Sequence, residues 1–280
     1  MFKYKFTEME RAQAVLVYEA TKTDMYQEMA IQDCHIWVRN TKLIESEKIN
    51  RCREKHGRAI VVLGDSHAMH LFNIISYSAH TPFIIGVSQG GCRPHDDKSY
   101  CHYGDFDEFL SKGKAFVDLL IFTQSGSYFI KDKSGRVDTQ SAFTGNFDSF
   151  ETQNIVKVKS YLNELSRRHN LNVLWVGPFL EFRWNPSQKL FTKEIYSVNP
   201  NSKILFGKLE ETISTSLRQE SNFKYVSYGS LFYEPSKSFE GNCFMFRDVD
   251  HYSKCGEKLI SKKLKPYFLM RFIRPGDELE

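Results

Sequence analysis

Short apolar runs alternate with longer stretches of helical periodicity along most of this chain. The runs are rich in Val, Ile, Leu and Phe, and the stretches between them place apolar residues three and four positions apart. Such alternation is typical of parallel strands that helices cover on both faces. The pattern therefore predicts an α/β fold, a three-layer α/β/α sandwich of flavodoxin-like form around a five-stranded parallel sheet. The expected strands are 59–63, 83–87, 117–123, 173–176 and 225–228, and the expected helices are 68–78, 106–112, 147–169, 202–220 and 253–270.

The first 33 residues form a separate segment in this pattern. Thr7-Glu8-Met9-Glu10 has the form of a helix-capping box, and no strong helix breaker follows it before about residue 30. We expect an amphipathic lead-in helix here, and a solvent-facing linker helix is the alternative. Its expected apolar side consists of Met9, Ala12, Tyr18, Met25 and Met29. The chain is thus divided into a lead-in over 1–33, one domain over 34–270, and a tail over 271–280 with the character of a cloning remnant.

Composition fits one packed domain and argues against some partners. The 280 residues include 23 Phe and 14 Tyr, which suit a well-packed core. The formal net charge is only +4, so the chain lacks the broad basic field that nucleic-acid binding needs. No segment reaches the roughly 18 consecutive apolar residues of a membrane helix. The first residues also lack the apolar stretch of a secretion signal.

Six cysteines argue for an oxidising compartment. Their spacing favours three local disulfides, which are Cys34 with Cys52, Cys92 with Cys101, and Cys243 with Cys255. Other pairings, and reduced buried cysteines, stay open at this point. A zinc site is a further alternative, with the ligand set Cys92, His95, Cys101 and His102. Because sequence neighbours rarely point at one ion, we expect no metal and no cofactor.

Ser66 lies where an exposed nucleophile is expected, between a predicted strand and a predicted helix. It stands in Gly64-Asp65-Ser66-His67-Ala68, and a serine at the carboxyl end of a parallel strand faces the crevice where such folds bind ligands. Near the end of the chain, Asp248-Val249-Asp250-His251 supplies a carboxylate and an imidazole. A serine hydroxyl needs a base at neutral pH, and His251 can take its proton while Asp248 fixes the imidazole tautomer. The expected catalytic residues are therefore Ser66, Asp248 and His251.

Three neighbouring residues are weaker candidates for the same roles. Asp250 competes with Asp248, but it is adjacent in sequence to His251, so we expect its side chain to point away from the imidazole. His67 and His70 lie close to the nucleophile in sequence, yet neighbours on a helix seldom bend back to act as its base. We expect them to pack or make polar contacts beside the site.

The remaining expected site residues follow the predicted strands. The backbone N–H groups of Ser66 and Gly91 are expected to hold an oxyanion, since glycine lets the backbone approach a ligand closely. A simple turn is the alternative for Gly90-Gly91. Gln124 and Ser125 are candidate substrate-binding residues, as is Trp184, which would border a sugar together with the aromatic residues of 176–182 unless these pack in the core.

Two motifs carry a resemblance to a known family. Gly64-Asp65-Ser66-His67-Ala68 together with Asp248-Val249-Asp250-His251-Tyr252-Ser253 resembles the SGNH (GDSL-type) hydrolase superfamily. More narrowly, the chain is similar from about Cys34 to about Leu264 to the SGNH domain fused to membrane-bound acyltransferases in bacterial surface-polysaccharide O-acetyltransferases. The wider superfamily supplies a third oxyanion donor from an Asn in a Gly-x-Asn-Asp block. This chain has no such Asn in 121–126, as is also common in the narrower group, and Gln124 or Ser125 is the expected substitute.

The resemblance implies an activity, partners and a location. We expect serine-dependent acyl transfer through an acyl-enzyme, with acetyl as the acyl group and a cell-surface glycan such as lipopolysaccharide O-antigen as the acceptor. The donor would be a membrane-bound acyltransferase domain, and the location would be the periplasm. A chain cut from a longer protein would explain disulfides without an export signal. A carbohydrate acetylesterase with the same triad and a non-catalytic glycan-binding module are the alternatives.

Overall fold

A parallel β-sheet forms the centre of the molecule. The computed structural model describes residues 6–78, 80–96, 100–101, 103, 105–113, 116–217 and 222–264. Within these residues the main sheet has six strands in the order β1-β3-β2-β4-β7-β8, and all of its neighbouring strands are parallel. The strands are β1 (His35–Val38), β2 (Ala59–Gly64), β3 (Ile84–Ser88), β4 (Val117–Thr123), β7 (Asn172–Val176) and β8 (Lys224–Val226).

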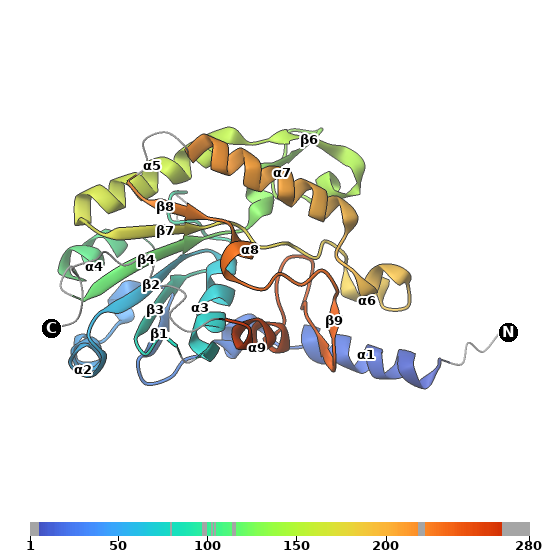
Figure 1. Cartoon of the computed structure of the whole chain (residues 1–280), viewed down its shortest axis with the longest axis horizontal. Helices are drawn as coiled ribbons and strands as arrows, with labels where there is room; N and C mark the ends of the chain where they lie inside the picture. Colours follow the sequence, from blue (N-terminus) through green and yellow to red (C-terminus); the bar gives the residue numbers. More distant parts are fainter. Residues whose placement is uncertain are drawn as a thin grey trace.

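Helices cover both faces of this sheet and complete the expected three layers (Figure 1). On one face α3 and α9 pack against each other, and on the other α5 packs against both α4 and α7. From β2 to β3 the chain moves toward the β1 edge of the sheet, and from β3 onward it moves toward the β8 edge. Because crossovers between parallel strands are right-handed, the helices of these two directions lie on opposite faces. The longer helices are α2 (Ser46–His56), α3 (Ser66–Ser78), α4 (Phe106–Gly113), α5 (Thr152–His169), α7 (Pro200–Leu217) and α9 (Lys254–Lys262).

Short elements fill the connections. Two antiparallel pairs lie outside the main sheet, β5 (Ile130–Asp132) with β6 (Phe147–Phe150) and β9 (Phe239–Glu240) with β10 (Cys243–Phe244). The short helices are η1 (Met25–Glu28), η2 (Thr41–Leu43), η3 (Gly126–Phe129), η4 (Ala142–Asn146), α6 (Pro186–Lys189), η5 (Lys193–Tyr196) and α8 (Tyr228–Leu231).

The structure confirms the α/β class and the parallel sheet and corrects some details. The sheet has a sixth strand that was not predicted, β1, a strand of four residues that pairs with β3 alone at the sheet edge. The predicted helix over 147–169 begins only at Thr152, since Phe147–Phe150 pairs with β5 as strand β6. The predicted helix over 253–270 ends at Lys262; residues 265–270 and the predicted tail lie outside the described residues.

The lead-in helix forms, but with a different buried side. Helix α1 (Glu8–Thr21) starts with the expected capping box, in which Thr7 and Glu10 bond to each other's backbone N–H groups. Met9 and Tyr18 are 65% and 64% exposed, whereas Val17 is buried. The expected apolar side was therefore wrong. The helix ends at Thr21, and the η1 turn follows it, so the predicted run to about residue 30 is interrupted.

Three disulfides join the six cysteines as the spacing predicted. The pairs are Cys34–Cys52, Cys92–Cys101 and Cys243–Cys255. Because the sulfurs of Cys92 and Cys101 are bonded to each other, they are not available as zinc ligands, and the alternative zinc set is excluded. His102, its fourth member, lies outside the described residues.

Across the described ranges, none of the helices combines the length and the apolar character that a membrane span requires.

Candidate active site

Strand β2 ends at a glycine that no other residue can replace without rearrangement. Gly64 has a φ of +151°, and a Cβ on it would lie 1.8 Å from the backbone oxygen of Thr123 on β4. The Tyr103 hydroxyl also donates a hydrogen bond to the Gly64 carbonyl. The chain can therefore leave the sheet close to β4 and turn at once into α3, with Ser66 as its first helical residue.

Asp65 fixes the turn before Ser66. Its Oδ1 accepts the His67 N–H at 2.9 Å in the manner of a helix cap, and its Oδ2 accepts the Ser125 N–H at 3.0 Å. One carboxylate thus ties the start of α3 to the loop that follows β4. The Ser66 side chain is held at the carboxyl end of the central strands, where α/β folds bind their ligands.

A tight loop before α9 presents the imidazole. Oδ1 of Asp248 accepts the N–H groups of Asp250 and His251 at 3.0 and 2.9 Å, and the Arg247 N–H donates to the His251 carbonyl. An Asp that bonds to backbone two and three residues ahead is typical of a turn that needs no support from the sheet. The Cys243–Cys255 disulfide joins the segment before this loop to the segment after it.

Ser66, His251 and Asp248 lie in a continuous hydrogen-bonded chain. The Oγ of Ser66 is 2.8 Å from Nε2 of His251, and both carboxylate oxygens of Asp248 are 2.9 Å from Nδ1. Burial would raise the pKa of Asp248, but the hydrogen bond and charge of His251 outweigh it and hold that pKa well below its ordinary value. Asp248 is therefore an anion that fixes a proton on Nδ1 and leaves Nε2 to accept from the serine.

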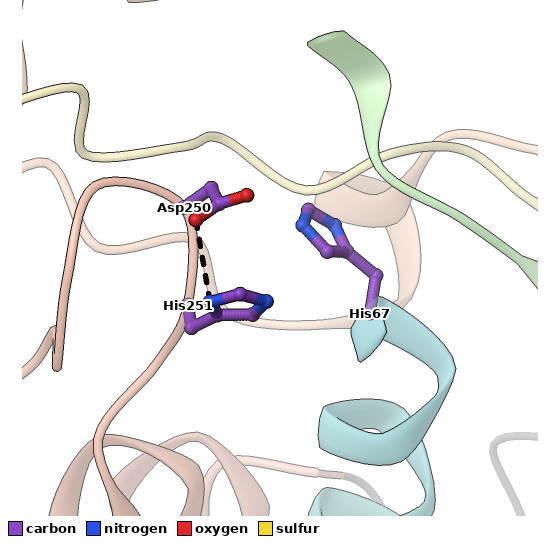
Figure 2. Close-up of side chains that lie close together, drawn as sticks. All are labelled: His67, Asp250 and His251. Atoms are coloured by element: carbon purple, nitrogen blue, oxygen red, sulfur yellow. Dashed lines mark ion pairs between the residues drawn. The ribbon is translucent and has the colours of Figure 1, made fainter. Parts of the chain in front are cut away.

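Asp250 also faces the imidazole, contrary to expectation. Its Oδ1 lies 3.2 Å from Nδ1 of His251 (Figure 2), because the turn made by Asp248 brings successive side chains to one side of the loop. Burial, with help from the charges of Glu181 and Asp248, raises the pKa of Asp250 to about 7. Burial alone would lower the pKa of His251, but the hydrogen bond that its Nδ1–H donates to Asp248 and the charges of both aspartates raise it to about 9.

The Gln89–Cys92 turn lies beside the serine. The Cys92 N–H bonds to the Gln89 carbonyl, and Gly91 has a φ of +70° with open space where a Cβ would be. The Gly90 N–H donates to the hydroxyl of Tyr26 at 3.1 Å, so the lead-in segment braces this turn. The Cβ position of Gly90 is 4.0 Å from Cβ of Ser66, which puts the turn against the nucleophile.

A buried charge cluster, which sequence reasoning missed, lies behind the site. Glu181 is 0% exposed and accepts hydrogen bonds from Ser125, from the Gly126 and Ser127 backbone, and from Arg183. The Arg183 N–H donates to the carbonyl of Val249, so the cluster also supports the His251 loop. Asp65 and Arg93 are its other buried members, and Asp138 pairs with Arg93 and Arg183 from the exposed side. The signal available beforehand was the pair Glu181 and Arg183 within an otherwise apolar segment.

The other candidate residues lie in different surroundings. Gln124 is buried, and neither atom of its amide has a hydrogen-bond partner among the described residues. Ser125 Oγ is already bonded to Glu181 and Ser127. Trp184 is half-buried with the Lys189 ammonium over its ring. Phe179 and Phe182 of the neighbouring segment are buried in the core, so they do not border a surface site.

His67 and His70 make the packing and polar contacts expected of them. The His67 ring stacks on Phe179 with ring centroids 4.1 Å apart, and Nδ1 of His70 lies 2.5 Å from a carboxylate oxygen of Glu257. Burial lowers the pKa of both histidines well below the ordinary value. Both are therefore neutral at physiological pH, and neither is bonded to Ser66.

A three-layer α/β fold with a serine, an imidazole and a carboxylate in contact at the carboxyl ends of its strands is typical of serine hydrolases, and the sequence comparison identifies which family of them this is. The sequence matches the family model described as "SGNH domain (fused to AT3 domains)" over residues 33–266. The chain belongs to this family, whose members are typically esterases or acyltransferases with a Ser-His-Asp triad.

Solved structures show weaker likeness. A protein from Slackia heliotrinireducens described as "a putative SGNH hydrolase" shares 12% identity, with a TM-score of 0.42 over 73% of this chain and 95% of that chain. A second crystal structure shares 12% identity, with a TM-score of 0.41 over 77% of this chain and 97% of the other. No curated protein is detectably similar in sequence.

Proposed function

We propose that this domain transfers an acyl group, by default acetyl, from a membrane-bound acyltransferase domain to a hydroxyl of a cell-surface glycan. The observation that carries the proposal is the 2.8 Å contact between Ser66 Oγ and His251 Nε2, with Asp248 on the opposite nitrogen. The family's fusion to AT3 domains supports a membrane acyltransferase as the donor and the periplasm as the location. Three disulfides are in keeping with that oxidising compartment.

In the first half-reaction Ser66 Oγ attacks the carbonyl carbon of the donor ester or thioester. His251 Nε2 takes the serine proton, and Asp248 stabilises the imidazolium that forms. The N–H groups of Ser66 and Gly91 are proposed to hold the oxyanion, with the buried Gln124 amide as a further donor. The intermediate collapses when His251 returns the proton to the leaving group, and the acyl group remains on Ser66.

In the second half-reaction the glycan hydroxyl replaces the donor. His251, unprotonated again, takes the proton of that hydroxyl as its oxygen attacks the acyl-serine carbonyl. Collapse releases the acylated glycan, and the proton returns to Ser66. Trp184, next to the loop that carries Glu181 and Arg183, is proposed to contact the acceptor.

The test separates transfer from hydrolysis. The protein is incubated with a chromogenic acetyl ester, with and without deacetylated O-antigen oligosaccharide, and both the released chromophore and the mass of the glycan are followed. We expect slow ester hydrolysis without glycan, acetylated glycan when it is present, and loss of both in Ser66→Ala. If the protein releases acetate from acetylated glycan but does not transfer acetyl groups to the deacetylated glycan, it is an acetylesterase. Equal turnover by the wild type and Ser66→Ala would exclude both the acyltransferase and the acetylesterase.

A further inference from the structure

Both ring nitrogens of a completely buried histidine remain without partners beside the triad. His67 is 0% exposed, and neither Nδ1 nor Nε2 has a hydrogen-bond partner within the described part of the chain. The nearest acidic atom to Nε2 is Oε1 of Glu181, at 3.8 Å, which is too long for a hydrogen bond. Buried polar atoms normally have a hydrogen-bond partner, so the partner of this ring is a bound group such as an ion and not a protein side chain.

Two further donor atoms face the same space. Figure 2 shows the His67 ring at the start of α3, with Asp250 and His251 opposite it on the loop before α9. One ligand atom from each of the three residues lies within 4.8 Å of the other two, and Asp250 Oδ1 is already 3.2 Å from Nδ1 of His251. Ligands on a tetrahedral zinc ion are about 3.3 Å apart, so no separation among the three atoms has to shorten by more than about 1.5 Å.

We propose that His67, Asp250 and His251 form an inhibitory site for Zn²⁺, a regulation that rests on the catalytic role proposed for His251. Two imidazoles and one carboxylate are a donor set that Zn²⁺ favours. The carboxylates of Asp248, Asp250 and Glu181 lie around this space together with the guanidinium groups of Arg183 and Arg93 and the imidazole of His251, whose positive charge is lost when the ion binds.

The ion would block the reaction without breaking the Ser66 contact. The protonated imidazole of His251 loses its Nδ1 proton to solvent, and Zn²⁺ takes the lone pair that this frees on Nδ1. The remaining ring proton is on Nε2, so this nitrogen can donate to Ser66 Oγ but can no longer accept the Ser66 proton. Asp248, whose oxygens lie 2.9 Å from the same Nδ1, loses its hydrogen bond and is close enough to take the fourth coordination position.

The experiment compares two histidines whose ring nitrogens both lack hydrogen-bond partners among the described residues. His95, the control, is half-buried, and its ring packs against Tyr128 and Phe122 and not against the triad residues. Zn²⁺ binding is measured by competition with a chromogenic chelator for the wild type, His67→Phe and His95→Phe. We expect one site per chain in the wild type, at least about tenfold weaker binding in His67→Phe, and no change in His95→Phe.

Activity provides the second readout. Zn²⁺ should inhibit acetyl-ester hydrolysis by the wild type over the same concentrations at which it binds, and a chelator should restore the rate. Each variant is compared with its own metal-free rate, and His67→Phe should need at least about tenfold more metal for the same fractional inhibition. If His67→Phe does not unfold cooperatively on heating, Asp250→Asn replaces it with the same expected loss. Equal Zn²⁺ affinity in the wild type and His67→Phe, or no stoichiometric site, would overturn the proposal. Because binding is measured without substrate, an inactive protein that still shows the His67-dependent site would refute the proposed function and leave the metal site standing.

Discussion

Replacing Asp250 by Asn should move the pH dependence of the reaction without removing the base. Asp250 brings a second carboxylate to His251, with Oδ1 3.2 Å from Nδ1, and together with Asp248 it raises the pKa of His251 to about 9. An opposite charge at this range typically shifts a pKa by about 1–3 units. Because Asp248 remains, we expect a fall of about 1–2 units, or about 1.4–2.7 kcal/mol in the protonation equilibrium.

The sign follows from the role of His251 as a base. The imidazole accepts the serine proton only when it is unprotonated, so kcat/KM should rise with pH through the pKa of His251. In Asp250→Asn the rise should occur earlier, and near pH 7.5 the variant should work at a roughly tenfold larger fraction of its own alkaline plateau than the wild type does. Below the Asp250 pKa of about 7 the wild-type carboxyl is itself protonated, so the two profiles should converge there.

The assay is initial-rate hydrolysis of an acetyl ester over a pH series, corrected for spontaneous hydrolysis. Asp248→Asn is the matched control. That variant should lose on the order of 10³–10⁴-fold in plateau rate because the tautomer is no longer fixed, whereas Asp250→Asn should lose far less. An unchanged midpoint in Asp250→Asn, or a midpoint at higher pH, would refute the electrostatic role assigned to Asp250.

Two substitutions test what holds the site in place, both by chemical denaturation. Gly64→Ala puts a Cβ against the Thr123 carbonyl and should lower the free energy of unfolding by more than about 3 kcal/mol. The control, Gly207→Ala on helix α7, has open space for its Cβ and should be neutral or slightly stabilising. Similar effects of the two substitutions would contradict the close approach of β2 and β4. Glu181→Ala leaves Arg183 buried without its partner and should cost about 3–5 kcal/mol, and a loss below about 1 kcal/mol would show that the pair is not buried as described.

The sequence predicted the parts of this fold that have strong local signals. The apolar runs of β2, β3 and β4 are buried on both faces, so their composition alone identifies them as central strands. Strand β1 was not predicted because its apolar run is only the three residues after His35, which have no clear strand signal of their own; length alone is not the reason, since the three-residue edge strand β8 was predicted. The disulfides were predictable because each joins cysteines close in sequence.

The candidate site likewise has features that local sequence predicts and features that depend on contacts between distant segments. The geometry of Ser66 and of the His251 loop follows from local turn chemistry, with Gly64, Asp65 and Asp248 as the residues that set it. Apart from Arg183, the partners of Glu181 are Ser125, Gly126 and Ser127, which lie more than fifty residues away, and sequence spacing does not predict such contacts. The orientation of Asp250 was mispredicted for a related reason, since adjacent side chains diverge on a strand but not in the tight turn that Asp248 makes.

The most direct test of the account is the mass of the protein after brief exposure to an activated acetyl donor. We predict one added acetyl group per chain, located by peptide mapping on Ser66, absent in Ser66→Ala and longer-lived in His251→Gln once formed, because the deacylating base is gone. Acetylation that maps to another residue, or that persists unchanged in Ser66→Ala, would contradict a serine-centred acyl transfer.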